Sequence, residues 1–164
     1  MSIIISSENI KKEQSLGGKA THLSALLQMN VNVPSFFVIH PDAFYRSLSD
    51  EQKEIFDSND QEKIQALFDH LPEPKDLQDH LVSFIKKWAE PQDVFAVRSS
   101  AQDEDSSTAS FAGQLKSVLG VTQETLWPAI AEVWKSGFSK HVYEYRHQKN
   151  VLGPPSCPAV IIQK

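Results

Sequence analysis

The chain has 164 residues, of which 40% are hydrophobic and 23% are charged. It is therefore long enough to bury one core and has the composition of a globular protein. Its net charge of −5 argues against broad binding to nucleic acid or to anionic membranes, because both call for a basic surface. No apolar run approaches the roughly 18 residues of a transmembrane helix. The single cysteine, Cys157, excludes an internal disulfide and favours a location in the cytoplasm.

The first forty residues predict a strand, a helix and a second strand. The apolar run at residues 3–5 has no basic segment before it, which is typical of a strand rather than of a secretory signal. Residues 17–19, Gly-Gly-Lys, precede a helical pattern whose apolar face consists of Ala20, Leu23 and Leu27. Residues 36–39 predict a short buried strand, and Pro41 is expected to open the next helix.

A long helical region follows. Residues 50–89 predict helices throughout, with breaks at residues 58–59 and at Pro72 and Pro74. The last of these helices has an apolar stripe that is typical of a core-facing helix and consists of Leu77, Leu81, Phe84, Ile85 and Trp88.

The second half of the chain predicts strands and two more helices. The strands are expected at residues 94–97, 115–121 and 159–162. A helix is expected to begin near Thr125, because Pro128 is tolerated only in a first turn, and another helix is expected over residues 140–150. The last strand has no successor, which suggests a chain cut inside a larger protein. Strands mixed with long helices predict an α+β or α/β domain.

Lys19 is the first candidate ligand-binding residue. A cation at a helix N-terminus opposes the helix dipole by about 0.3–1 kcal/mol, and an anion bound between the free N–H groups and the ammonium reverses this effect. The glycines before Lys19 would let the backbone approach such a ligand. The alternative is an exposed lysine after a turn. A Walker A loop is excluded, because Glu13 and Ala20 stand where that motif needs Gly and Ser or Thr.

Arg98 is the second candidate. It directly follows the apolar strand at residues 94–97, and an arginine in such a place is rarely fully buried without a partner. Its guanidinium group suits phosphate or carboxylate. The alternative is an ion pair with one of the three acids at residues 103–105.

The loop over residues 99–110 combines hydroxyls, amides and acids. An EF-hand that starts at Asp103 is excluded, because Thr108 and Gln114 replace the required Gly and Glu. The small residues would allow close contact with phosphates, and Gly113 would let the chain bend back. The alternative is a solvated loop with a purely structural bend.

Other chemistries are disfavoured. No G-x-S-x-G elbow surrounds Ser99 or Ser100, which argues against a serine hydrolase. The six histidines lack a close cluster of zinc ligands. Cys157 has no activating neighbour in the sequence, so an inert thiol is expected.

Several motifs occur in order along nearly the whole chain. They are GGKA at residues 17–20, VPSFFV at 33–38, AVRSSA at 96–101, ED at 104–105, ASFAGQ at 109–114, VWKS at 133–136, YR at 145–146 and VIIQK at 160–164. Together they resemble the N-terminal ATP-binding domain of the pyruvate phosphate dikinase and phosphoenolpyruvate synthase family.

This resemblance implies a fold and a kinase-type function. The fold is an α+β, ATP-grasp-like module with a mixed sheet and flanking helices, which binds ATP and Mg²⁺ between two subdomains. Family members pass a phosphoryl group from ATP to a histidine on a swivelling domain, and a further domain phosphorylates pyruvate. The resemblance makes Arg98 a catalytic residue. The ATP-binding residues that it implies are Lys19, Arg98, Ser99, Ser100, Gly113 and Gln114, with residues 99–114 as a phosphate loop.

The same resemblance places other parts of the site outside this sequence. The metal ligands and a second set of ATP contacts are expected beyond residue 164, so residues 1–164 are expected to be the N-terminal portion of the ATP-binding domain and inactive alone. The expected partners are ATP and downstream phosphohistidine and acceptor domains, without nucleic acid or membrane. Two alternatives stay open: a related phosphotransferase with a glucan or rifampin acceptor, and a non-catalytic regulatory module that binds nucleotide. The acceptor and the oligomeric state are not predicted.

Overall fold

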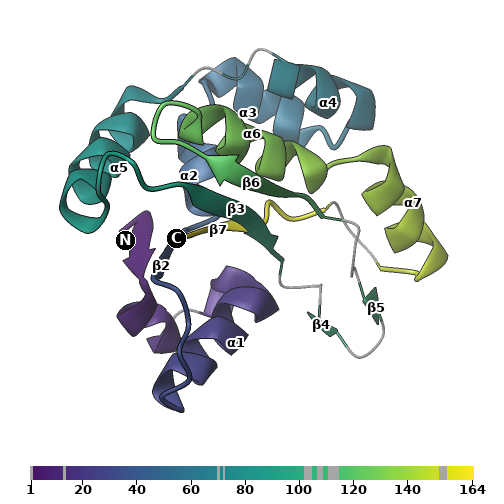
Figure 1. Ribbon diagram of the computed structural model, residues 1–164. Coiled ribbons are helices and arrows are strands. Elements are labelled where there is room, and N and C mark those ends of the chain that lie inside the picture. Colours follow the sequence, from purple (N-terminus) through teal and green to yellow (C-terminus); the bar gives the residue numbers. More distant parts are fainter. Residues whose placement is uncertain are drawn as a thin grey trace.

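The computed structural model describes residues 2–12, 14–69, 71, 73–101, 105–106, 109–110, 115–151 and 155–164. Its helices lie on both faces of one five-stranded sheet (Figure 1). The strands of that sheet are β1 (Ile4–Ser6), β2 (Phe36–Ile39), β3 (Phe95–Ser100), β6 (Ser117–Val121) and β7 (Ala159–Gln163). The α-helices are α1 (Gly17–Gln28), α2 (Asp42–Ser47), α3 (Asp50–Asp57), α4 (Gln61–Asp69), α5 (Lys75–Trp88), α6 (Leu126–Ser136) and α7 (Lys140–Gln148). Two 3-10 turns at Ser7–Lys12 and Gln14–Leu16 precede α1.

The strand order in the sheet is β1-β2-β7-β3-β6, and neighbouring strands run antiparallel. The α+β class with flanking helices is as predicted, but the described sheet is antiparallel rather than mixed. Strands buried on both faces have continuous apolar sequences, and long helical connections favour parallel pairing. The burial pattern alone, however, does not fix the direction of a strand, so the antiparallel pairing could not be predicted from the sequence.

The central strands separate two hydrophobic cores. Phe36 and Val38 of β2 face α1, whereas Phe37 and Ile39 face the larger helical layer. This alternation follows from the two-residue period of a strand. Figure 1 shows α1 below the sheet, beside the helical turns that precede it, and α2 to α6 above the sheet.

Most of the predicted elements are confirmed. The helix α1 buries Ala20 and packs Leu23 and Leu27 on the smaller core. The long helical region divides into α3, α4 and α5 at the predicted breaks. Pro128 lies in the first turn of α6, where the missing N–H costs nothing. The bounds of two strands differ from the expectation: β3 begins at Phe95 and continues through Ser100, and β6 begins at Ser117.

Candidate nucleotide-binding site

The strand β3 presents Arg98 on the face of the sheet that α1 partly covers. Phe95 and Val97 pack into the larger core on the other face, so the alternation of the strand directs Ala96, Arg98 and Ser100 toward the α1 side. Arg98 pairs across the sheet with Ile161, which belongs to the smaller core on that side. It is half-buried. The guanidinium group is therefore supported by the sheet while part of it reaches solvent.

Gln163 is the described hydrogen-bond partner of Arg98. The Arg98 Nη1 donates to Gln163 Oε1 at 3.4 Å, and the Gln163 Nε2 donates to the Pro34 carbonyl at 3.4 Å. This amide therefore orients the guanidinium group through a neutral contact. Sequence reasoning missed this role of Gln163, although a single buried amide in an otherwise apolar strand was a signal for it. Asp103 and Glu104 lie outside the described residues, as does the side chain of Asp105, so the predicted ion pair remains a prediction.

The first turn of α1 docks on the end of β3. The Gly18 N–H donates to the Ala101 carbonyl at 3.4 Å, and the Ala20 N–H donates to the Ser100 Oγ at 3.1 Å. These contacts satisfy donors that a helix N-terminus leaves without intrahelical partners. The residue before the helix, Leu16, gives no side-chain cap. The helix N-terminus is therefore capped by Ser100, a residue 80 positions away from Ala20 in the sequence, instead of by a neighbouring side chain.

This docking explains Gly17. The residue has a φ of +77°, and a Cβ atom there would lie 2.5 Å from the Ser100 carbonyl carbon. Only glycine combines this conformation with so close an approach. The sequence predicted that this glycine would let the backbone approach a ligand, whereas in the structure Gly17 approaches the backbone of Ser100. Lys19 lies at the N-terminus of α1, as predicted, but as its third residue, because the helix already begins at Gly17; Lys19 is half-buried. Its turn is therefore held beside the strand that carries Arg98.

The two serines after Arg98 point to opposite faces. Ser100 is buried and holds α1 through its Oγ. Ser99 is fully buried toward the larger core, and its Oγ has no hydrogen-bond partner in the described part of the chain. Gly113 and Gln114 lie outside the described residues. The roles of these residues in ATP binding remain predictions.

Two short strands lie within the predicted phosphate loop. They are β4 (Asp105–Ser106) and β5 (Ala109–Ser110), which pair antiparallel. The sequence predicted an irregular loop here, because its small polar residues give no strand periodicity.

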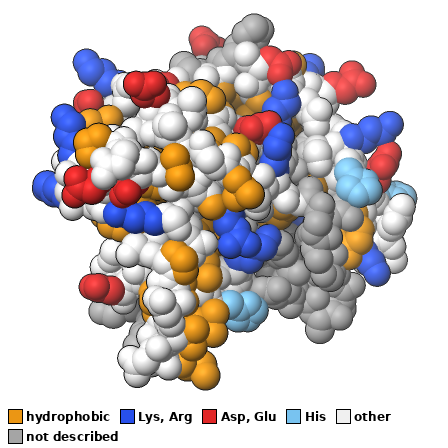
Figure 2. All heavy atoms as spheres, in the orientation of Figure 1, with side chains coloured by type: hydrophobic (Ala, Val, Ile, Leu, Met, Phe, Trp, Pro, Cys, Tyr) orange, Lys and Arg blue, Asp and Glu red, His pale blue; other side chains and the backbone are white. Residues whose placement is uncertain are grey.

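The sheet face near Arg98 is polar and open at the β6 edge. Ser117 pairs directly across from Arg98 and is exposed, and residues that pair directly point to the same face. Figure 2 shows Lys and Arg side chains near the middle of this view, between the helical layer and the region of α1. Such a surface suits an anion.

His40 is the one buried histidine among the residues that the structure describes. The Asp42 N–H donates to its Nδ1 at 3.1 Å, and its Nε2 lies 2.7 Å from Ser15 Oγ. These contacts connect the turn before α1 to the start of α2.

No described helix is long and apolar enough to cross a membrane. The described residues contain no group of three His, Cys, Asp or Glu side chains that could hold a metal ion.

Comparison with known proteins identifies the class and then the family. The antiparallel sheet with helices on both faces is consistent with the expected ATP-grasp-like N-terminal domain. The family model described as pyruvate phosphate dikinase, AMP/ATP-binding domain, matches residues 13–164. The chain belongs to this family, which confirms the prediction from the motifs.

Three relatives illustrate the range of the matches. An uncharacterised phosphotransferase, YvkC, of Bacillus subtilis is 32% identical over 93% of this chain and 18% of its own length. A rifampicin phosphotransferase of a Streptomyces species is 31% identical over 91% of this chain and 19% of its own. A probable phosphoenolpyruvate synthase of Methanothermobacter thermautotrophicus is 27% identical over 90% and 25%. The chain thus spans about a fifth of the length of the curated relatives that it matches.

Proposed function

We propose that this chain supplies nucleotide-phosphate contacts to a phosphotransferase, through Lys19 and Arg98. The observation that carries the proposal is the docking of the first turn of α1 on the end of β3. It holds the turn of Lys19 and the strand of Arg98 together, and Arg98 lies on the α1 side of the sheet. Membership in an AMP/ATP-binding family supports ATP as the ligand.

The chemical contribution of these residues is binding and charge neutralisation. Phosphoryl transfer is accelerated largely by positioning and by stabilising the charge on the phosphate oxygens. Arg98 offers a planar donor group that the amide of Gln163 orients, and Lys19 offers a compact ammonium group. We propose that the ligands of the Mg²⁺ that the resemblance implies come from residues beyond 164.

The proposed reaction passes a phosphoryl group from ATP, through a phosphohistidine, to an acceptor. The module formed by residues 1–164 would act with phosphohistidine and acceptor domains of the same protein. Pyruvate is our first candidate acceptor, as in phosphoenolpyruvate synthase, but a rifampicin phosphotransferase matches with similar identity. A product assay with each acceptor distinguishes the two, and turnover with neither would favour a regulatory module.

The test of the binding proposal is calorimetry with a non-hydrolysable ATP analogue and the full-length gene product. A charge-assisted hydrogen bond contributes about 1.5–3 kcal/mol, so Arg98→Ala should weaken binding roughly 10- to 100-fold. Lys19→Ala should weaken it in the same direction. Lys86→Ala is the control, because Lys86 is an exposed cation on α5, in the helical layer on the other face of the sheet. Equal affinity of the Arg98→Ala variant and the Lys86→Ala control would refute the proposal.

A further inference from the structure

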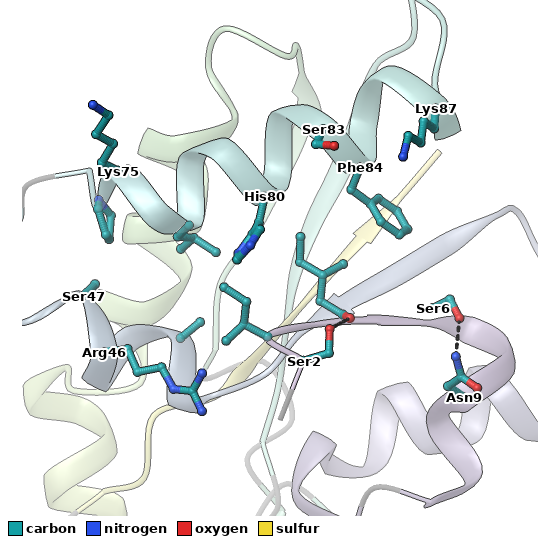
Figure 3. Close-up of a pocket in the computed structure, with 15 residues that line it drawn as sticks. Ser2, Ser6, Asn9, Arg46, Ser47, Lys75, His80, Ser83, Phe84 and Lys87 are labelled. Atoms are coloured by element: carbon teal, nitrogen blue, oxygen red, sulfur yellow. Dashed lines mark hydrogen bonds between the residues drawn. The ribbon is translucent and has the colours of Figure 1, made fainter.

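A large open groove lies away from Lys19 and Arg98. It has a volume of about 910 Å³ and lies between β1, α2 and α5 (Figure 3). The strand β1 is separated from β3 by β2 and β7, and α2 and α5 belong to the helical layer on the opposite side of the sheet from α1. The groove therefore lies in a different part of the fold from the proposed nucleotide site.

The walls of the groove include apolar side chains. Ile3 and Ile4 come from the edge of the sheet, and Leu77 and Phe84 come from α5. Ile3, Ile4 and Phe84 are only partly buried, so part of their apolar surface faces the groove. A cavity of this size with partly apolar walls is typical of sites for small organic molecules.

The other prominent feature of the lining is positive charge. Arg46, Lys75 and Lys87 line the groove, and none of its described lining residues is acidic. None of these three side chains has an ion pair or a hydrogen bond with another described residue. A cleft lined by one sign of charge concentrates ligands of the opposite sign.

The arrangement along α5 gives the groove its length. Leu77, His80, Phe84 and Lys87 follow a spacing of three and four residues, so they share one face of the helix. Lys75 and Lys87 are separated by about 18 Å of helix rise. Figure 3 shows Arg46 toward one end of the groove and Lys87 toward the other, with His80 between them and the Lys75 side chain directed away from the groove.

We propose that this groove binds an elongated organic anion with an apolar body and negative groups at its ends. The apolar body would lie on Phe84 and the isoleucines of β1, and its acidic groups would reach Arg46 at one end and Lys87 at the other. This site is separate from the nucleotide site and does not depend on the proposed function.

The test uses bis-anilinonaphthalene sulfonate, an aromatic probe with two sulfonates, and follows its fluorescence on titration with the purified protein. We expect saturable binding that weakens with added salt. Lys87→Glu should weaken binding about five- to tenfold, because it replaces an attraction by a repulsion. Lys86→Glu is the matched control: Lys86 is exposed in the same helical turn, carries the same charge and does not line the groove.

Each outcome decides the proposal. A loss for Lys87→Glu with an effect of less than about twofold for Lys86→Glu supports it. Equal effects of the two variants would overturn it, because net charge alone would then explain the binding, and so would the absence of saturable binding. Displacement of the probe by a saturating ATP analogue would also overturn it, since the two sites would not be separate. Circular dichroism of both variants excludes unfolding as the cause.

Discussion

Gly17→Ala should destabilise the protein by separating α1 from β3. A side chain at a φ of +77° costs about 1–2 kcal/mol for an L-residue. The new Cβ would also lie 2.5 Å from the Ser100 carbonyl carbon and 2.6 Å from its oxygen, so the helix must move. That movement weakens the Gly18 and Ala20 hydrogen bonds to β3, each of which contributes about 0.5–1.5 kcal/mol. We expect a total loss of about 2–4 kcal/mol in the free energy of unfolding, measured by urea denaturation.

Gly120→Ala is the matched control. Gly120 has a similar φ of +69°, but a Cβ there meets nothing within 4 Å. This variant should lose only the conformational part, about 1–2 kcal/mol. The difference between the two variants then measures the docking of α1 on β3. If Gly17→Ala is no less stable than Gly120→Ala, the docking does not explain the glycine.

Three other predictions concern buried or paired side chains. Ser100→Ala should lower the free energy of unfolding by about 1–3 kcal/mol, because it leaves a buried N–H of α1 without its acceptor. Ser99→Ala should leave the free energy of unfolding unchanged or raise it, because the Ser99 Oγ has no described partner. Urea denaturation of both variants measures the difference, and equal losses would contradict this prediction. Burial raises the pKa of the Cys157 thiol, so iodoacetamide at pH 8 should alkylate it at least about tenfold more slowly in the native protein than in urea, and equal rates would contradict the burial. The ammonium of Lys164, which donates to Asp93, and the Glu90 N–H lower the pKa of Asp93. Its stabilisation is therefore present at neutral pH and is lost as the pH falls through that lowered pKa. Asp93→Asn should be less stable than the natural protein at pH 7, and the difference should shrink in strong acid, as chemical denaturation across pH would show.

The sequence predicted features that depend on local spacing. The apolar face of α1 and the stripe on α5 were visible because a helix repeats every 3.6 residues. The placement of Ser99 and Ser100 on opposite faces was also within reach, because a strand that continues past Arg98 must alternate. The sequence analysis instead placed both serines in a loop after Arg98 and gave them the same role.

Other features depend on contacts between distant segments and could not be read from spacing. The need for glycine at position 17 arises from the backbone of Ser100, and the orientation of Arg98 arises from Gln163. The basic groove joins cations of α2 and α5 that form no motif in the sequence. In each case the decisive neighbour comes from another element of the fold.

The central claim is that Arg98 and Lys19 contact the phosphates of a nucleotide. The most direct measurement compares the binding of adenosine and of a non-hydrolysable ATP analogue by the full-length protein and its Arg98→Ala variant. We predict that the variant loses affinity for the ATP analogue roughly 10- to 100-fold and keeps its affinity for adenosine. Equal losses for both ligands, or no loss for the ATP analogue, would contradict the claim.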